Sequence, residues 1–241
     1  MTKISIAMAT YNGARFIQEQ LNSFAAQTRL PDELVITDDG STDDTLGIIG
    51  RFAATAPFCV QVQRNPQRLN YSRNFERAIS LCSGDIIFLS DQDDVWFPKK
   101  IQTVAAKFIA RSEVMVVIND QIVTDAQLVC SKRTVLENLE RVGRTSDALI
   151  WGCCTALRRS WAEHAFPMPP QADLLIACRE LAHDQWIHKL ATLLNVRTVV
   201  REPLQFYRRT GANAAAFIFG DSSTVGLRDL AKGRIPVQPV S

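Results

Sequence analysis

The amino-acid sequence predicts an α/β fold with a mostly parallel central sheet flanked by helices. In the first half of the chain, short apolar runs typical of buried strands alternate with segments whose apolar residues recur at helical spacing. Such alternation implies crossover connections, which make neighbouring strands parallel. Loops rich in Asp, Asn and Gly follow three of these strands. Because ligands bind at the carboxyl ends of strands in open α/β sheets, the three loops predict one shared crevice.

The first half of the chain divides into predicted strands and helices in order. The strands are expected at residues 4–8, 34–37, 59–63, 85–89 and 114–118. The helices between them are expected on four apolar sets: Ile17, Leu21 and Phe24; Leu46, Ile49 and Phe52; Phe75, Ala78, Ile79 and Cys82; and Ile101, Val104 and Phe108. Ser41 and Asp44 resemble a capping box for the second helix, and Pro98 suits the first turn of the fourth.

After Asn119 the regular alternation stops, and residues 120–181 are expected to be irregular. The breakers there are Pro167, Pro169 and Pro170. A helix returns at His183, because apolar residues through Leu194 recur at helical spacing. A strand at 198–200 and an apolar segment at 204–207 follow. Since the sequence shows no repeat and no linker, a single domain is expected over residues 1–215, with a loose tail at 216–241.

Composition and charge limit the class of protein. The net charge of +2 gives no strong case for a nucleic-acid partner, and none is expected. The basic residues from Arg197 onward are taken as a solvated surface, with attraction to an anionic membrane face or a diphosphate as the alternative. The sequence has no signal-peptide pattern, no apolar run of membrane-spanning length and no CxxC pair among its six cysteines. A cytoplasmic protein is therefore expected, with peripheral contact at the inner face of the cell membrane left open.

The most informative segment is an acidic loop after the fourth predicted strand. Asp91, Asp93 and Asp94 directly follow the apolar run 86–89. Carboxylates crowded at one place repel one another unless a cation compensates them, and oxygen ligands suit Mg²⁺ or Mn²⁺. An acidic loop alone is more often a solvated turn, but its position at a strand end favours a divalent-cation site.

Several motifs together resemble one known family. They are Ala9-Thr10-Tyr11-Asn12-Gly13, Asp38-Asp39-Gly40-Ser41-Thr42-Asp43-Asp44-Thr45, Arg73-Asn74 and Ser90-Asp91-Gln92-Asp93-Asp94-Val95-Trp96. These motifs resemble the family 2 glycosyltransferases, which have the GT-A fold. Segments 183–186 and 206–209 are similar to bacterial rhamnosyltransferases of surface polysaccharide synthesis. Over residues 3–215 the resemblance implies one Rossmann-like GT-A domain, with a nucleotide-sugar-binding half at 1–119 and an acceptor-side half at 120–215.

The resemblance also implies an activity. It is the transfer of a sugar from a nucleoside-diphosphate sugar, with dTDP-rhamnose as a candidate, to a hydroxyl of a glycan or lipid-linked oligosaccharide, with inversion. Mn²⁺ or Mg²⁺ would stabilise the charge that develops on the leaving diphosphate. The oligomeric state is not predicted. The alternative is a catalytically weak member that binds nucleotide sugars within an assembly complex.

On the donor side, the family assigns roles residue by residue. By resemblance, Asp93 is the metal ligand, Asp91 faces the donor's ribose or sugar, and Asp39 accepts a hydrogen bond from the pyrimidine ring. The other residues expected at the donor are Ala9, Thr10, Tyr11, Arg73, Gln92 and Arg208. Helix capping near Pro98 is the preferred interpretation of Asp94. Tyr11 as a cover for the sheet edge, and Arg73 as a lone surface arginine, remain open.

On the acceptor side, Asp184 matches the family's catalytic base. Its alternative is a charge or cap at the start of the predicted helix. The other acceptor-side residues by resemblance are Trp151, Gly152, Cys153 and His183; Trp151 could instead be a buried core residue. Relatives often carry a His shortly after the Tyr-Arg motif, where this chain has Thr210 to Asn213. Three alternatives are therefore open: weak metal binding, a water in the vacant position, or Arg208 or Arg209 doing part of the cation's work.

Overall fold

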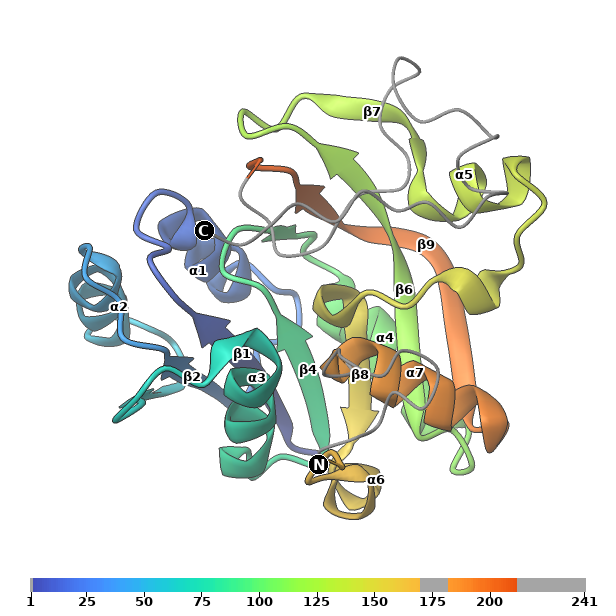
Figure 1. Cartoon of the computed structure of the whole chain (residues 1–241), viewed down its shortest axis with the longest axis horizontal. Coiled ribbons are helices and arrows are strands. Elements are labelled where there is room, and N and C mark those ends of the chain that lie inside the picture. Colours follow the sequence, from blue (N-terminus) through green and yellow to red (C-terminus); the bar gives the residue numbers. More distant parts are fainter. Residues whose placement is uncertain (1, 170–181, 212–241) are drawn as a thin grey trace. The chain divides into compact units, whose positions relative to one another are not determined.

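The computed structural model describes residues 2–169 and 182–211, and the strands in these ranges form a nine-stranded sheet (Figure 1). The strand order is β3-β2-β1-β4-β8-β6-β9-β5, and β7 pairs with β6. The strands are β1 (Ile4–Thr10), β2 (Glu33–Asp38), β3 (Cys59–Arg64), β4 (Ile86–Ser90), β5 (Val95–Trp96), β6 (Val116–Thr124), β7 (Cys130–Thr134), β8 (Thr155–Arg158) and β9 (Arg197–Arg208). The described residues up to Arg208, in the ranges 2–169 and 182–208, form one compact unit.

The first four strands in this order are parallel, as predicted. β1 lies between β2 and β4, and β3 pairs with the outer side of β2. In this register Thr10 of β1 lies beside Asp38 of β2, and Met8 lies beside Ser90 of β4. The carboxyl ends of β1, β2 and β4 therefore share one edge of the sheet.

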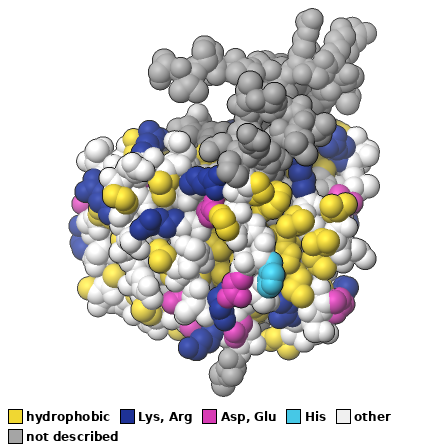
Figure 2. Space-filling model, turned by 60° about the horizontal axis from the view of Figure 1, so that its bottom comes forward, with side chains coloured by type: hydrophobic (Ala, Val, Ile, Leu, Met, Phe, Trp, Pro, Cys, Tyr) yellow, Lys and Arg dark blue, Asp and Glu magenta, His cyan; other side chains and the backbone are white. Residues whose placement is uncertain are grey.

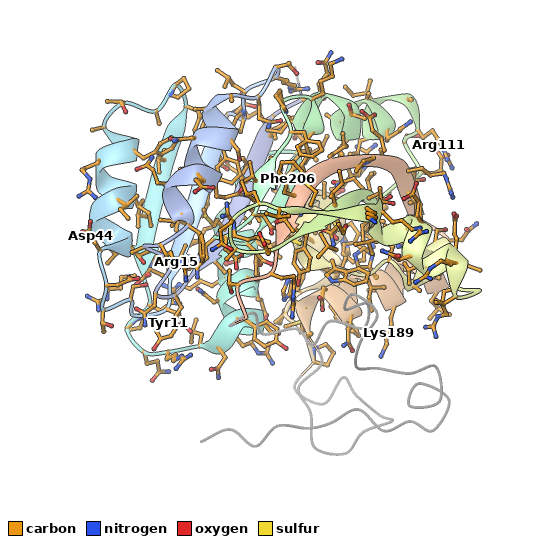
Figure 3. All side chains as sticks on the ribbon, turned by 90° about the horizontal axis from the view of Figure 1, so that it is seen from above. Tyr11, Arg15, Asp44, Arg111, Lys189 and Phe206 are labelled. Atoms are coloured by element: carbon orange, nitrogen blue, oxygen red, sulfur yellow. The ribbon has the colours of Figure 1, made fainter. Side chains whose placement is uncertain are left out.

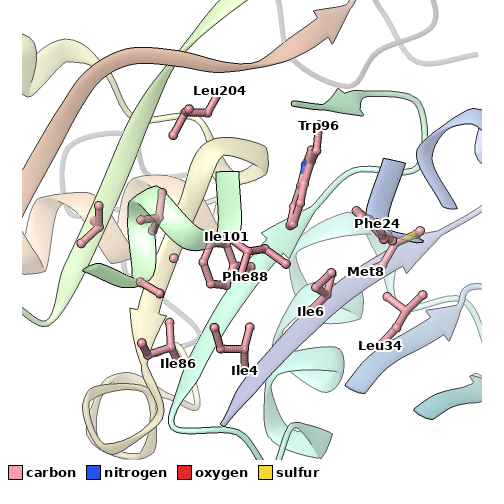
Figure 4. Packing of buried hydrophobic residues seen from close by; sticks show 14 of the residues in the cluster. Ile4, Ile6, Met8, Phe24, Leu34, Ile86, Phe88, Trp96, Ile101 and Leu204 are labelled. Carbon is pink, nitrogen blue, oxygen red and sulfur yellow. The ribbon is translucent and has the colours of Figure 1, made fainter. Parts of the chain in front are cut away.

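Helices cover both faces of these strands, which confirms the predicted α/β class. The helices are α1 (Ile17–Ala25), α2 (Thr45–Ala53), α3 (Asn70–Leu81), α4 (Lys100–Ala110), α5 (Val135–Arg141), α6 (Arg159–Ala165) and α7 (His183–Leu193). α1, α2 and α4 contribute to one buried apolar cluster, and α3, α6 and α7 contribute to a second one. Figure 4 shows the first cluster, in which Ile4, Ile6 and Met8 of β1 lie close to Phe24 and Phe88. Strands buried on both faces read as continuous apolar runs, which is why their prediction succeeded.

The expectation that residues 120–181 are irregular is wrong for the described part, 120–169. That range contains β7, α5, β8 and α6, each of four to seven residues. Such elements are too short to show a periodic pattern, and pairing stabilises them: β8 runs antiparallel to both β4 and β6. The strands expected at 114–118 and 198–200 are also longer, because β6 and β9 pair in parallel along their lengths. Pro170 and the predicted tail 216–241 lie outside the described residues.

Two local predictions meet different outcomes. The helix at His183 is confirmed as α7. The capping box of Ser41 and Asp44 is wrong: Asp44 is the N-cap of α2 but its side chain makes no capping hydrogen bond, and the Ser41 hydroxyl donates to Asp38. Ser41 lies in the loop between β2 and α2, where the buried Asp38 carboxylate accepts the proton of its hydroxyl.

Charged side chains of both signs occur on the surface of the described residues. On the face shown in Figure 2, basic and acidic side chains lie among apolar ones. Within the described ranges, no helix combines the length and the apolar character needed to span a bilayer.

Candidate active site

The loops that follow β1, β2 and β4 meet at one edge of the sheet. The hydroxyl of Thr10, at the end of β1, donates to the carboxylate of Asp38 at 3.1 Å. The side-chain amide of Gln92, after β4, accepts a hydrogen bond from the Tyr11 N–H and donates one to the Tyr11 carbonyl, both at 3.0 Å. Tyr11 and Asp44, from the first two loops, lie on the same side of the molecule (Figure 3). The predicted convergence of the three loops is therefore confirmed.

Asp39 lies under the segment that leads into α3. Its carboxylate is 4% exposed and accepts hydrogen bonds from Asn65 Nδ2 at 3.1 Å, Leu69 N at 2.6 Å and Asn70 N at 2.9 Å. The Oδ1 atom of Asn65 is buried and has no hydrogen-bond partner within the described ranges. One buried acceptor atom next to Asp39 is therefore not satisfied by the described part of the chain.

Tyr11 presents a ring that is 37% exposed. The guanidinium of Arg68 lies over this ring, 4.0 Å from its centroid, and Arg68 Nε is 4.0 Å from Asp39 Oδ2. An exposed ring beside a cation suits a flat ligand that carries negative charge. Ala9 is partly buried within β1. Arg73, predicted at the donor, donates to Glu76 at 2.6 Å and to the Met168 carbonyl at 3.1 Å.

The acidic loop meets a cysteine from the second half of the chain. One ligand atom each of Asp91, Asp94 and Cys153 lies within 4.8 Å of the other two. Asp94 and Cys153 are buried, and Asp91 is partly buried. Burial, then the neighbouring carboxylates of Asp94 and Asp93, raises the pKa of Asp91 well above its usual range. This crowding of anionic groups suits a divalent cation, as the sequence suggested, although the group includes Asp94 and Cys153 rather than Asp93.

The helix-cap interpretation of Asp94 is wrong. Its carboxylate is fully buried and accepts hydrogen bonds from the Arg208 N–H and from Gln205 Nε2, both at 3.1 Å. Burial, and next the charge of Asp93, raises the pKa of Asp94 to about 7. The chain turns into β5 directly after Asp94, so its side chain points to β9 and not to α4.

Arg208 is buried and stabilises the acidic loop through hydrogen bonds. The residue is 2% exposed; its guanidinium donates to the carbonyl groups of Asp93 and Ala126, both at 2.8 Å, and to the Glu19 carboxylate. The same guanidinium lies 4.7 Å from the centroid of the Phe16 ring. Contact of this arginine with the backbone of Asp93 links β9 to the loop after β4.

A buried lysine, which the sequence analysis missed, completes the network. Lys100 Nζ donates to the Cys153 carbonyl at 3.1 Å and to Gln205 Oε1, and it lies 3.8 Å from the Trp96 ring centroid. Gln205 in turn donates to Asp94, so the amine is coupled to the carboxylate through one amide. Burial lowers the pKa of Lys100 to about 8. The available signal was its position on the apolar stripe of α4, one residue before Ile101.

Asp184 lies in the first turn of α7, where a Cβ on Gly152 would be 3.5 Å from its Cβ. Its Oδ1 accepts a hydrogen bond from the Gln185 N–H at 2.7 Å, while the N-cap of the helix is Ala182. The charge of Asp184 is one of the causes that raise the pKa of Asp91. The predicted base and the acidic loop, which are far apart in sequence, therefore lie near each other.

His183 is buried beside the acceptor-side segment. Its ring stacks on Phe75 with centroids 4.3 Å apart, and neither ring nitrogen has a hydrogen-bond partner among the described residues. Burial lowers the pKa of His183. A Cβ on Gly152 would lie 2.6 Å from His183 Nε2, so glycine is required there. Gly152 and His183 thus lie together, as the resemblance implied.

A chain of hydrogen bonds holds Trp151 in place. The Thr155 hydroxyl donates to the Trp151 carbonyl at 2.8 Å and lies 2.8 Å from His188 Nε2. His188 Nδ1 accepts a hydrogen bond from Arg197 Nε at 3.1 Å. Arg197 also donates to the carbonyl groups of residues 146 and 149. Trp151 is partly buried, so its ring is neither a fully buried core residue nor a free surface one.

Comparison with known proteins identifies the relatives of this arrangement. Residues 5–166 match the family model described as Glycosyl transferase family 2. An uncharacterized glycosyltransferase of Nostoc sp. is 31% identical over 224 residues, which are 88% of this chain and 66% of that protein. The dTDP-rhamnosyl transferase RfbG of Shigella flexneri is 38% identical over 99 residues, or 39% of this chain and 34% of that protein. The chain spans less than two thirds of the length of both relatives.

Solved structures show the same fold. TarS of S. aureus in complex with UDP superposes with a TM-score of 0.67 at 20% identity, over 86% of this chain and 60% of that chain. The mannosyltransferase PcManGT of Pyrobaculum calidifontis, in complex with GDP-Man and Mn²⁺, gives a TM-score of 0.63 at 20% identity, over 86% and 56% of the two chains. The GT-A fold expected from the sequence is therefore confirmed.

Proposed function

Since this chain belongs to glycosyl transferase family 2, we propose that it transfers a sugar from a nucleoside-diphosphate sugar to a hydroxyl of a glycan or lipid-linked acceptor, in surface polysaccharide synthesis. The observation that carries the proposal is the position of Asp184, on α7. A Cβ on Gly152 would lie 3.5 Å from Asp184 Cβ, and the Sγ of the next residue, Cys153, lies within 4.8 Å of carboxylate oxygens of Asp91 and Asp94. This position brings a proton acceptor to the place where a donor sugar would lie. The similarity to RfbG favours dTDP-rhamnose as the first donor to test.

The nucleoside would bind where the loops after β1 and β2 meet. The exposed Tyr11 ring offers a stacking surface, and the Asp39 carboxylate offers an acceptor for an N–H group of a base. Arg68, at 4.0 Å from the ring, places a positive charge beside that surface. Residues 1–119 would thus form the donor half and residues 120–215 the acceptor half.

A divalent cation fits the acidic loop on two grounds. The ligand atoms of Asp91 and Asp94 lie within 4.8 Å of each other, and burial, followed by the charges of neighbouring carboxylates, raises the pKa of both carboxyls. The cation, when bound, would stabilise negative charge on the departing diphosphate. Lys100 and Arg208, both buried, would hold the loop in shape through Gln205 and the Asp93 carbonyl.

Asp184 would act as general base in a single displacement. Its carboxylate takes the proton of the acceptor hydroxyl while that oxygen forms a bond to the anomeric carbon of the donor sugar. The bond between this carbon and the diphosphate oxygen breaks, and its electron pair leaves with the nucleoside diphosphate. Attack from the face opposite the leaving group inverts the configuration at the anomeric carbon.

Binding of nucleoside diphosphates tests the donor half directly. We expect one of dTDP, UDP or GDP to raise the melting temperature of the protein in a thermal-shift panel. At one hundred times the dissociation constant, ligand binding adds about 2.7 kcal/mol, which corresponds to roughly 5–10 °C in a chain of this size. Tyr11→Ala should abolish this shift, whereas Tyr71→Ala, which also removes an exposed tyrosine ring, should retain it.

Turnover then separates an enzyme from a binding protein. Nucleoside-diphosphate release from the matching sugar donor, in the presence of a glycolipid extract, supports the proposal. A protein that binds the nucleotide but never releases product from any donor of the panel would support the alternative of a binding member of an assembly complex. A protein that binds none of the nucleotides would contradict both.

A further inference from the structure

Cys153 places a thiol in the carboxylate pair of the acidic loop. The residue lies in the 3₁₀ helix Gly152–Cys154, which precedes β8, and its side chain is 2% exposed. Its Sγ and one carboxylate oxygen each of Asp91 and Asp94 lie within 4.8 Å of one another. We propose that Cys153 is the third protein ligand of the divalent cation, so that the site prefers thiophilic cations such as Zn²⁺, Co²⁺ or Cd²⁺ to Mg²⁺. This inference rests on the proposed function for the location of the cation.

The thiol already touches the carboxylate pair, because its hydrogen bond is one of the causes that lower the pKa of Asp94. Its hydrogen bond to Gln121 Oε1 is long, at 3.6 Å, and Gln121 is fully buried with an Nε2 that has no partner within the described ranges. A water bound to the cation would supply an acceptor for that amide. Metal ligands are commonly oriented by such outer hydrogen bonds. The neighbouring Cys154 differs, because its Sγ lies 3.3 Å from the Trp151 carbonyl and outside the carboxylate pair.

Charge balance gives an independent argument. Two carboxylates and a thiolate carry three negative charges, and the buried Lys100, which is joined to Asp94 through Gln205, carries one positive charge. A divalent cation would bring the sum of these four groups to zero, and the charges of Asp93 and Asp184, which also act on Asp91, add to the negative side. Buried charges that remain uncompensated are costly, so a thiolate is stable there only together with a cation.

The spacing of the three ligand atoms is close to that of a metal site. Around an ion with Zn–S and Zn–O bonds of about 2.0–2.3 Å, ligand atoms in a tetrahedron lie roughly 3.3–3.8 Å apart. The observed limit of 4.8 Å requires a contraction of about 1 Å. Thiolate ligands favour softer cations, while Mg²⁺ demands oxygen ligands in an octahedron. The imidazole that relatives often carry after the Tyr-Arg motif is absent from positions 210–213 of this sequence, and sulfur from the 3₁₀ helix before β8 would then take its place.

Cobalt spectroscopy of the purified full chain tests the ligand directly. A thiolate bound to Co²⁺ gives a sulfur-to-metal charge-transfer band in the near ultraviolet. We expect this band to saturate at about one equivalent of Co²⁺ in the unaltered protein and in Cys154→Ser. It should be absent from Cys153→Ser, whose affinity for Co²⁺ in calorimetry should fall about tenfold or more, with Mg²⁺ affinity unchanged. Circular dichroism of each variant establishes that it is folded.

Three results would overturn the inference: Co²⁺ bound without the band, a band that persists in Cys153→Ser, or no Co²⁺ bound by the folded protein. In each case the nucleoside-diphosphate shift, measured without metal, decides separately whether the proposed function holds. An unfolded Cys153→Ser is replaced by Cys153→Ala, for which the same results are expected.

Discussion

Replacement of Asp184 by Asn separates the role of a proton acceptor from that of a helix charge. Asp184 is not the N-cap of α7, and the hydrogen bond that its Oδ1 accepts from the Gln185 N–H can be kept by the Oδ1 of Asn. The structural loss is therefore the attraction between one carboxylate and the helix dipole, about 0.3–1 kcal/mol. In a chain of 241 residues that lowers the melting temperature by roughly 1–4 °C.

The catalytic loss should be much larger than the structural one. A positioned general base is worth about 10²–10⁴-fold in rate, which is about 2.7–5.5 kcal/mol on the barrier. We propose that Asp184 acts on the acceptor and not on the nucleotide, so transfer should fall by that factor while nucleoside-diphosphate binding is retained.

The assay is nucleoside-diphosphate release with time, using the donor found in the thermal-shift panel and a glycolipid extract as acceptor. The matched control is Asp44→Asn, which removes a carboxylate from the N-terminus of α2, where it pairs with Arg51. That variant should transfer at the wild-type rate. If Asp184→Asn loses more than about 10 °C of melting temperature, or keeps wild-type turnover per folded molecule, Asp184 is a structural residue and the base lies elsewhere.

Two further predictions address stability. In Gly13→Ala, the added Cβ would overlap the Gln92 side chain and break its two hydrogen bonds to Tyr11, so the free energy of unfolding should fall by about 1–3 kcal/mol and nucleoside-diphosphate binding should weaken. Gly50 lies in α2 with open space around an added Cβ, so Gly50→Ala should instead raise the free energy of unfolding in urea by about 0.5–1 kcal/mol. Equal behaviour of the two variants would contradict a stabilising role for the Gln92 hydrogen bonds to Tyr11. The pH dependence concerns Asp94, whose pKa is about 7 in the folded protein against 3.8 for the ordinary side chain. Between these values the folded protein holds a proton that the unfolded chain releases, so the free energy of unfolding should decline as the pH rises from about 4 to about 7. Asp94→Asn should flatten this slope in denaturant titrations. An unchanged slope would mean that other groups cause the pH dependence.

The first half of the fold was predictable because its signals are local. Strands such as β2 and β4 are buried along their whole length, so each appears as a continuous apolar run. The helices between them carry one apolar face, which recurs at helical spacing. β8 could not be predicted in this way, since four residues of mixed character form a strand there by pairing with β4 and β6.

The candidate site likewise has one part that local sequence signals predict and one part that they do not. The sequence by itself determined which residue types end the parallel strands, and thus that Tyr11, Asp39 and Asp91 meet at one edge, because parallel strands share the direction of their carboxyl ends. Only the tertiary structure decided that Asp94 faces β9, that Lys100 is buried beside it and that Cys153 joins the carboxylates. Those contacts join segments far apart in the chain, and they depend on how β8 and β9 enter the sheet. No periodic sequence pattern predicts these contacts. They depend on backbone pairing between distant strands and on buried charges that only residues close in space can compensate.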